Sequence, residues 1–398
     1  MLAIATLMTA TQAHAQTETV LHSFGAEKKD GQRPFTGLTA DASGNLYGTT
    51  FYGGAHGYGT AFKLTPAAGG AWTETVMHTF NHDGRDGIYP EGNLILDSAG
   101  NVYGTASAGG THGYGSVFEL SARAGGGWTE KTLHNFNVLP DGQNPSAGVV
   151  FDAAGNIYGT TAYGGVHGVN GGTVFELTPN ATGGWTEKSL YSFLYGGTDG
   201  YYVGSGVILD TLGNIYGTTT NGGLYGDGIV FELTPKAGGS STETILHNFN
   251  GTDGWSPSAG LILDASGNLY GSTEVGGANH AGVVFELSRA AGGGWSETLL
   301  HTFSDGTDGF GPDSNLIFDS SGNLYGTTGG GGAYGLGIAF ELTPSASGAW
   351  TESILHTFGI FGDGSGPVGL VFNANGNLYG TTEIGGVHGL GTVFEVTP

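Results

Sequence analysis

The chain has 398 residues, of which 81 are glycine and none is cysteine, and its formal net charge is −24 at neutral pH. With 34 acidic residues against 10 basic ones, the protein repels nucleic acid and anionic membrane surfaces, whereas cations, neutral saccharides and proteins remain suitable partners. Its 6 tryptophans, 18 tyrosines and 21 phenylalanines exclude a disordered, glycine-rich polymer, and stability must come from packing rather than disulfides.

Residues 1–15 have the pattern of a short secretory signal. An apolar run over Leu2–Met8 precedes a small-x-small cleavage pattern that ends at Ala15, although the usual basic start is missing. The alternative is an ordinary N-terminal tail. No other apolar run approaches the ~20 residues that span a bilayer. We therefore predict a secreted, extracellular or cell-surface protein without a membrane span, whose mature chain covers residues 16–398.

A long repeat follows, marked by the phrase "GNLYGTT" and its close variants. Its tyrosine recurs seven times at intervals of 54 to 58 residues. The positions are Tyr47, Tyr103, Tyr158, Tyr216, Tyr270, Tyr325 and Tyr379. A period of this length, filled with short strand-like runs between glycine turns, is typical of a propeller blade of four strands.

The second unit shows how each repeat reads in chain order. A short apolar run, Leu94–Leu96, leads through the turn Asp97–Asn101 into "VYGTA". The glycine-rich loop Gly109–Gly115 precedes "SVFEL", and Trp128–Phe136 completes the unit. These runs predict strands a, b, c and d, rich in β-branched and aromatic residues. No window has a sustained period of 3.6 residues, so we expect an all-β fold with essentially no helix.

The two ends of the chain are complementary. The first unit begins with a lone d strand, Thr17–Phe24, and the last stops after strand c, Thr392–Pro398. Pairing of these segments would complete a seventh blade and leave no open sheet edge. We therefore predict a single seven-bladed β-propeller of four-stranded blades, residues 16–398, and a monomer. Strand a should line the central channel, and the d–a and b–c loops should share one loop-rich rim.

Strand d carries a repeated histidine, and strand c carries a repeated acid. The strand-d positions are His22, His78, His134, Tyr191, His247, His301 and His356. The strand-c positions are Lys63, Glu119, Glu176, Glu232, Glu286, Glu341 and Glu395. A metal or acid–base pair is one interpretation. A reaction does not need seven copies of its catalyst, whereas each blade must satisfy its buried polar groups. We therefore favour a structural histidine–carboxylate or histidine–backbone bond in each blade.

The d–a loops share an Asp-Gly pair. Its aspartates are Asp30, Asp86, Asp141, Asp199, Asp253, Asp308 and Asp363. Turn formation accounts for them, because Asp bonds to its own backbone and Gly takes positive φ. None matches a calcium loop, although a ring of seven carboxylates on one rim would attract cations such as Ca²⁺ loosely. We expect no cofactor.

Histidines also occupy the b–c loops, in the pattern "GGxHGxG", at His56, His112, His167 and His388. A phosphate site is disfavoured because the loop leads into a strand rather than a helix. A metal site would need histidines from different blades to converge, since no close pair has zinc-site spacing. Capping of the turns is the favoured interpretation, and the four residues remain ligand-binding candidates.

The departures from the repeat are more informative about function. The position after Asp-Gly is aromatic in three consecutive units, at Tyr201, Trp255 and Phe310, with Tyr202 beside the first. Adjacent exposed aromatic rings stack on sugars or anchor a protein partner; the alternative is that they cover the blade interfaces.

Two acids in the b–c loops also break the pattern, Glu274 and Glu383. A carboxylate pair supports glycoside hydrolysis if the separation is ~5–10 Å, a distance that the sequence does not give.

The combined motif "DxxGNLYGTT…GG…G…G.VFELTP" resembles the GloVer tandem-repeat family of exported bacterial proteins, over all seven units. The resemblance implies export, a repeat fold and often a C-terminal surface anchor, but no activity and no catalytic residue. We predict a binding scaffold for saccharide or protein that uses the loop-rich rim. The alternatives are a polysaccharide lyase or glycoside hydrolase with a histidine and acid site on that rim, and a passive matrix component.

Overall fold

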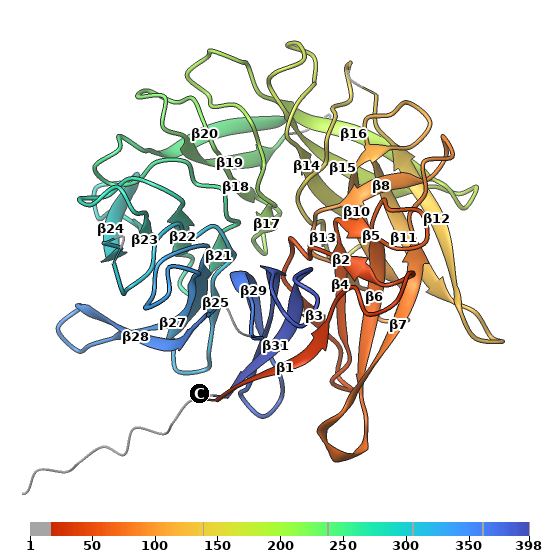
Figure 1. The fold of residues 1–398 in the computed structure, drawn as a ribbon. Coiled ribbons are helices and arrows are strands. Elements are labelled where there is room, and N and C mark those ends of the chain that lie inside the picture. Colours follow the sequence, from red (N-terminus) through yellow and green to blue (C-terminus); the bar gives the residue numbers. More distant parts are fainter. Residues whose placement is uncertain (1–16, 138, 237–238, 305, 360–361, 398) are drawn as a thin grey trace, which may run out of the picture.

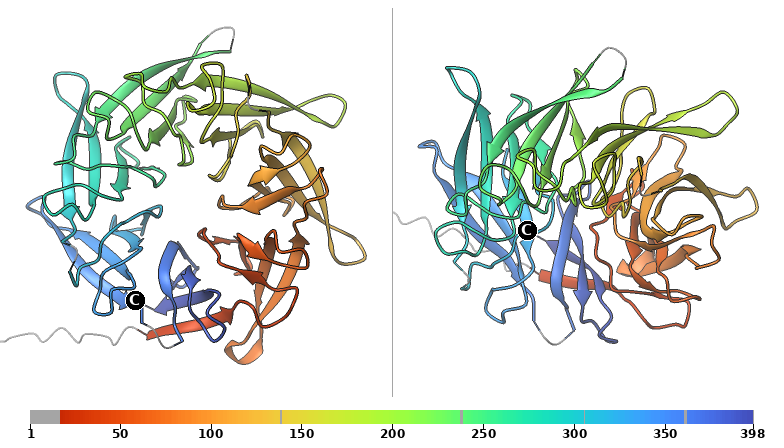
Figure 2. Two further views of the ribbon diagram at one scale, coloured as in Figure 1. Left: turned by 45° about the horizontal axis from the view of Figure 1, so that its top comes forward. Right: turned by 90° about the horizontal axis from the view of Figure 1, so that it is seen from above.

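Seven small antiparallel sheets surround a common axis in the computed structural model (Figures 1 and 2). The structure describes residues 17–397, apart from 138, 237–238, 305 and 360–361, so the predicted signal lies outside the described residues. Within the described part, helix is limited to one 3-10 turn, Ala68–Gly70. None of the described segments forms an apolar helix of membrane-spanning length. The predicted all-β, seven-bladed propeller is confirmed.

The strands of the first four blades follow one another along the chain. Blade 1 comprises β3 (Thr39–Ala40), β4 (Leu46–Thr50), β6 (Thr60–Pro66) and β7 (Trp72–Thr79); blade 2 comprises β9 (Ile95–Leu96), β10 (Val102–Gly109), β11 (Ser116–Ala122) and β12 (Trp128–Asn135); blade 3 comprises β13 (Val150–Phe151), β14 (Ile157–Thr161), β15 (Thr173–Pro179) and β16 (Trp185–Ser192); blade 4 comprises β17 (Ile208–Leu209), β18 (Ile215–Thr219), β19 (Ile229–Pro235) and β20 (Ser241–Asn248).

The remaining blades repeat this order. Blade 5 comprises β21 (Ile262–Leu263), β22 (Leu269–Thr273), β23 (Val283–Arg289) and β24 (Trp295–Thr302); blade 6 comprises β25 (Ile317–Phe318), β26 (Leu324–Thr328), β27 (Ile338–Pro344) and β28 (Trp350–Thr357); blade 7 comprises β29 (Ser365–Phe372), β30 (Leu378–Ile384), β31 (Thr392–Thr397) and the N-terminal β1 (Thr17–Ser23). Three further short strands, β2 (Gly31–Gln32), β5 (Tyr52–Gly53) and β8 (Gly87–Pro90), pair d–a loops with the ends of b–c segments on the rim.

The ring closes where the two ends of the chain meet. Strand β1 pairs antiparallel with β31, so that Glu18 lies opposite Val396 and Ser23 opposite Thr392. The backbone N–H of Phe24 extends this pairing with a 3.0 Å hydrogen bond to the carbonyl of Gly391. In Figure 2 the red N-terminal strand lies along the blue C-terminal blade. The predicted closure is therefore confirmed.

The core lies between the blades rather than within one central mass. At each of the seven interfaces, the phenylalanine that follows a d strand meets the strand-c phenylalanine of the next blade, with ring centroids 4.9–5.3 Å apart. Phe24 and Phe62 make this contact at the closing interface, and both are fully buried. Each blade therefore packs chiefly on its two neighbours, as in other repeat folds.

The recurring phrase "GNLYGTT" is explained by this packing and by one turn. In blade 1, the carboxylate of Asp41 accepts hydrogen bonds from the backbone and side-chain amides of Asn45 and from the hydroxyl of Tyr47. The glycine after the tyrosine lies against the strand-c phenylalanine: a Cβ on Gly48 would lie 2.6 Å from Cζ of Phe62. The phrase thus specifies the a–b hairpin and the inner packing of each blade.

Candidate functional site

A polar cluster of three side chains occupies every blade interface. Strand d of one blade supplies the repeated histidine, the following d–a loop supplies the Asp-Gly aspartate, and strand d of the next blade supplies the glutamate of "WTE". From interface 7/1 to interface 6/7 the clusters are His22–Asp30–Glu74, His78–Asp86–Glu130, His134–Asp141–Glu187, Tyr191–Asp199–Glu243, His247–Asp253–Glu297, His301–Asp308–Glu352 and His356–Asp363–Glu18. Their ligand-type atoms lie within 4.8 Å of one another at five interfaces.

The predicted partner of the histidine is therefore corrected. His134 bonds through Nε2 to Asp141 Oδ2 at 3.0 Å, not to the strand-c acid of its blade. Glu119 lies opposite Lys131, whereas His134 lies opposite Val117 beyond a β-bulge, so the two side chains are out of register. The strand-c acids instead accept hydrogen bonds from the repeat tyrosines, for example at 2.8 Å from Tyr158 to Glu176.

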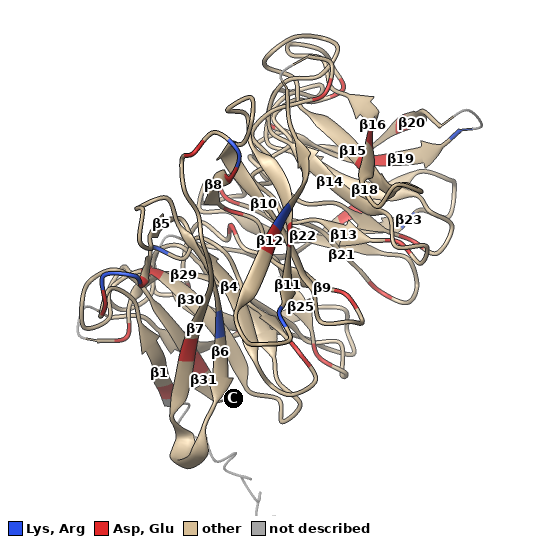
Figure 3. Ribbon diagram, turned by 90° about the vertical axis from the view of Figure 1, so that its right-hand side faces the viewer, with Lys and Arg blue, Asp and Glu red and all other residues tan. Residues whose placement is uncertain are grey.

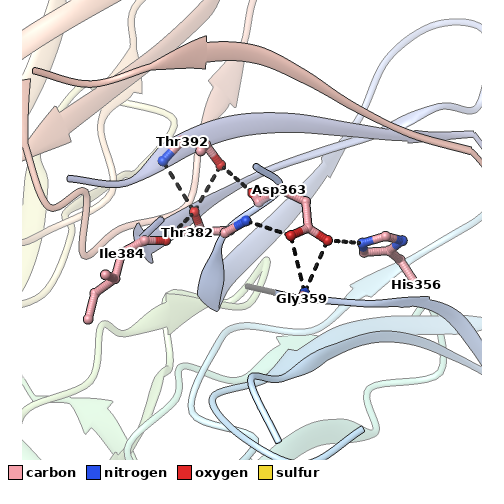
Figure 4. A network of polar contacts seen from close by, with 7 residues as sticks. His356, Gly359, Asp363, Thr382, Ile384 and Thr392 are labelled. Atoms are coloured by element: carbon pink, nitrogen blue, oxygen red, sulfur yellow. Dashed lines mark hydrogen bonds and ion pairs between the residues drawn. The ribbon is translucent and has the colours of Figure 1, made fainter. Parts of the chain in front are cut away.

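The Asp-Gly aspartates do not form an open ring of carboxylates on the rim. Figure 4 shows Asp363 enclosed by its partners: the carboxylate contacts His356 at 3.1 Å and accepts the backbone N–H groups of Gly359 and Gly364. Its carbonyl accepts the hydroxyl of Thr392. Asp30, at the closing interface, is only 4% exposed. Asp30 and Asp363 thus link the strand-d histidine to the d–a loop, and a loose attraction of the aspartates for cations such as Ca²⁺ stays a prediction.

Burial raises the pKa of the glutamate in each of the seven clusters. Burial raises the pKa of Glu243 to about 7, and the charge of Asp199 adds to the effect. Burial likewise raises the pKa of Glu74 and of Glu187 to about 7, with further contributions from Asp30 and Asp141. These clusters hold protons near neutral pH because two carboxylates share one poorly hydrated site.

The b–c loop histidines lie apart from these clusters. His56, His112, His167 and His388 are all exposed at loop tips. Among the residues that the structure describes, no group of three metal-ligating atoms within 4.8 Å includes any of them. The sequence thus placed them correctly in the b–c loops, but the structure does not bring them together.

A pocket lined by tyrosines lies on the loop-rich rim between blades 3 and 4. Its volume is about 270 Å³. The lining residues are Tyr163 and Asn170 from the b–c loop of blade 3, Tyr195, Tyr201 and Tyr202 from the following d–a loop, and Asn221 from the b–c loop of blade 4. Tyr195 and Tyr201 have ring centroids 4.8 Å apart, and Tyr163 and Tyr202 have centroids 5.1 Å apart. We call these six residues the tyrosine pocket.

The other aromatic candidates do not join it. Trp255 is 46% exposed and pairs through its backbone with Val275 in its own blade, and Phe310, 43% exposed, lies over Gly330. A second cavity of about 230 Å³ does adjoin the tyrosine pocket, because Tyr163 lines both. Tyr114 contributes to that second cavity from the neighbouring blade 2. Tyr201 and Tyr202 were thus predicted, whereas Tyr163 and Tyr195 were missed because they lie outside the repeated aromatic position.

The central channel opens on the same rim. Strand-a segments of all seven blades line it, as predicted, mostly with small residues. Its mouth is a cavity of about 410 Å³ lined by Arg33, Phe35, Phe51, Tyr52, Glu91, Ser146, Asp313 and Glu383. Phe51, in the wall of this cavity, stacks on Tyr89 with ring centroids 4.8 Å apart. We call this cavity the axial mouth.

Asp313 is the most perturbed acid of the axial mouth. Solvent reaches its carboxylate, but surrounding protein atoms remove much of its hydration, which raises its pKa to about 6; the charges of Glu274 and Glu383 add to this. Burial also raises the pKa of Glu383, against the opposing charge of Arg33. Glu274 and Glu383, the two acids that break the repeat pattern, thus contribute to the raised pKa of Asp313, a residue that the sequence did not identify as a candidate.

The profile of the Gloeobacter/Verrucomicrobia repeat matches residues 5–223 and again 204–398. The chain belongs to this repeat family. No curated protein sequence matches the repeat-family chain. Acidic positions are spread over the blades of the repeat and far outnumber basic ones in Figure 3.

Solved structures share the propeller fold of this repeat-family member. One is a putative 6-phosphogluconolactonase from Bacteroides uniformis, with a TM-score of 0.55 and 13% identity over 90% of this chain and 95% of that one. Another is an ancestral GH74 enzyme, with a TM-score of 0.58 and 12% identity over 96% of this chain and 51% of that one. At such identities the likeness concerns the fold alone.

Proposed function

We propose that the protein is an extracellular scaffold that binds neutral saccharides at the tyrosine pocket of the loop-rich rim. The observation that carries the proposal is the convergence of four tyrosines and two asparagines, from three separate loops, on one cavity. Aromatic rings offer flat apolar faces together with a polar edge, which suits the C–H faces and hydroxyls of a sugar. The signal-like residues 1–15 support a location outside the cell.

The charge and shape of the rim favour a neutral, extended ligand. A formal net charge of −24 disfavours acidic polysaccharides through long-range repulsion. The two cavities that share Tyr163 adjoin each other on the rim, one lined by residues from blades 3 and 4 and the other reaching blade 2. Two adjoining subsites fit an oligosaccharide better than a single monosaccharide. Asn170 and Asn221 supply amide donors and acceptors for sugar hydroxyls.

A glycan array probed with the mature chain tests this proposal. Loss of one stacking ring removes ~0.5–1.5 kcal/mol, so Tyr201→Ala should weaken binding of the selected glycan roughly 3- to 10-fold. Trp255→Ala is the matched control, because this exposed aromatic residue occupies the same repeat position outside the pocket. Equal binding by Tyr201→Ala and wild type, or no binding to any neutral glycan, would contradict the proposal.

The axial mouth favours a second candidate function, hydrolysis or eliminative cleavage of a polysaccharide. Asp313, whose pKa burial raises to about 6, lines this cavity together with the carboxylic acids Glu91 and Glu383. General acid–base cleavage of a glycosidic bond uses two carboxyl groups in different protonation states. Reducing-end and unsaturated-product assays on a polysaccharide panel test it. Activity that Asp313→Asn does not abolish would reject the assignment.

A further inference from the structure

The seven interface clusters are not equivalent. In two of them, between blades 4 and 5 and between blades 5 and 6, the histidine Nε2 and a glutamate Oε1 are buried without a hydrogen bond. The histidine lies 3.8 and 4.0 Å from its two carboxylates between blades 5 and 6, and the separations are shorter between blades 4 and 5. At interfaces 7/1, 1/2, 2/3 and 6/7 the histidine is hydrogen-bonded directly to its aspartate. At interface 4/5, His247 Nε2 lies 3.4 Å from Asp253 Oδ2 and 3.7 Å from Glu297 Oε1. Both His247 Nε2 and Glu297 Oε1 are buried and make no hydrogen bond.

The loop of the cluster between blades 4 and 5 is the shortest of the seven. Asp253 follows His247 by six positions, whereas the aspartate follows the corresponding strand-d residue by seven or eight positions at every other interface. In the shortened loop, the amide Nδ2 of Asn250 donates a 2.6 Å hydrogen bond to Asp253 Oδ2, and its backbone N–H donates to Oδ1. Asn250 thereby holds the carboxylate by its own bonds, and the direct bond to the histidine is lost.

We propose that His247, Asp253 and Glu297 form a binding site for a divalent transition-metal ion of the zinc type, at the interface of blades 4 and 5. One imidazole nitrogen and two carboxylates are donors that Zn²⁺ takes in proteins, with water as the fourth ligand. Ligand atoms on a tetrahedral Zn²⁺ lie about 3.3–3.6 Å apart, which the 3.4 and 3.7 Å separations approach.

Three further observations fit this assignment. The side chains of His247, Asp253 and Glu297 are 18%, 17% and 11% exposed, so the cluster lies near the surface, while the unbonded atoms His247 Nε2 and Glu297 Oε1 are themselves buried. The ring of Phe249 meets the imidazole edge-on, with centroids 4.7 Å apart, and fixes its orientation. Calcium fits poorly, because it takes six to eight oxygen ligands and this site offers only two carboxylates. An ion here would link strand β20 to strand β24 across the interface.

The chain itself supplies a variant that should fold. At interface 3/4, Tyr191 occupies the histidine position and donates hydrogen bonds to both Asp199 and Glu243 at 3.2 Å. His247→Tyr therefore removes the metal-binding nitrogen with a side chain that this repeat already accommodates. His78→Tyr is the matched control, since His78 Nε2 is already hydrogen-bonded to Asp86 Oδ2 at 2.9 Å.

Calorimetric titration of zinc chloride into the chelator-treated mature chain, near neutral pH, tests the site. Wild type and His78→Tyr should bind the same number of tight ions, and His247→Tyr should bind one fewer. Loss of the ion should coincide with loss of the zinc-dependent rise in melting temperature. If His247→Tyr binds as many ions as wild type, or if wild type binds none tightly, the proposal is wrong. Circular dichroism shows whether each variant is folded, and Glu297→Gln provides a second test if His247→Tyr is not.

Discussion

Removal of the Phe24 ring should destabilise the protein as strongly as the same change in the middle of the chain. Phe24 is fully buried, and its ring meets Phe62 of blade 1 edge-on at 5.1 Å. Phe249 makes the equivalent contact with Phe285 at 5.2 Å, at interface 4/5. Phenylalanine-to-alanine changes at such buried sites cost ~3–5 kcal/mol. We expect a loss in this range for Phe24→Ala, although the residue lies only nine positions beyond the predicted signal, residues 1–15.

The comparison of Phe24→Ala with Phe249→Ala isolates the closure of the ring. Urea unfolding of both variants, followed by tryptophan fluorescence, gives the two losses of unfolding free energy. In a closed ring each variant leaves the same cavity between two blades, and the losses agree within ~1 kcal/mol. In an open array, Phe24 would belong to a terminal strand with one neighbour. A loss for Phe24→Ala below about 1 kcal/mol, beside a large loss for Phe249→Ala, would refute the closure.

Three other substitutions test separate features of the interfaces and blades. Glu243→Gln keeps the side-chain volume but removes a carboxyl group whose pKa burial raises to about 7. It should stabilise the protein by ~1–2 kcal/mol at about pH 8.5, after allowance for screening, and by almost nothing at about pH 5, where the wild-type carboxyl is protonated. The wild type should itself lose stability as the pH rises from about 5 to 8, and equal thermal shifts of the variant at about pH 5 and about pH 8.5 would contradict this reasoning. Gly104→Ala should cost ~1–3 kcal/mol in urea unfolding because its Cβ would lie 2.7 Å from a phenylalanine ring, whereas Gly125→Ala, with no atom near its Cβ, should change stability by less than ~0.5 kcal/mol. Thr381→Val should cost ~0.5–1.5 kcal/mol in the same assay, because its hydroxyl donates a 2.7 Å hydrogen bond across the closing interface to the carbonyl of Thr36; an unchanged midpoint would show that this bond contributes nothing.

The blade count and the ring closure could be predicted because both depend on local signals. The a–b turn is specified within five residues: Asp97, Gly100 and Asn101 bond to one another, so the turn forms in the same way in every unit. Strand order then follows from the turns, and the lone strand β1 has only the free edge of β31 to pair with. The blade count and the ring closure therefore follow without knowledge of any distance between residues that are far apart in the sequence.

The partner of the repeated histidine could not be predicted in the same way. His134 receives its aspartate from the following loop and its neighbouring glutamate, Glu187, from the next blade. A β-bulge between the positions opposite Val117 and Phe118 shifts the register of strands c and d, and simple alternation along strand d does not show it. The sequence identified the residue types of the cluster correctly but joined the wrong pair.

The candidate sites lie where the repeat changes, and they lie close together along the ring. Tyr191, in strand β16, replaces the interface histidine between blades 3 and 4. The d–a loop that follows this strand provides Tyr195 and Tyr201 to the tyrosine pocket. The next interface has the shortened loop that leaves His247 without a hydrogen bond. Since each blade packs chiefly on its neighbours, a change at one interface leaves the other interfaces intact. The regular interfaces thus hold the ring together, while two consecutive interfaces carry the two proposed binding sites, and the loops between blades 3 and 5 are where a ligand should be sought first.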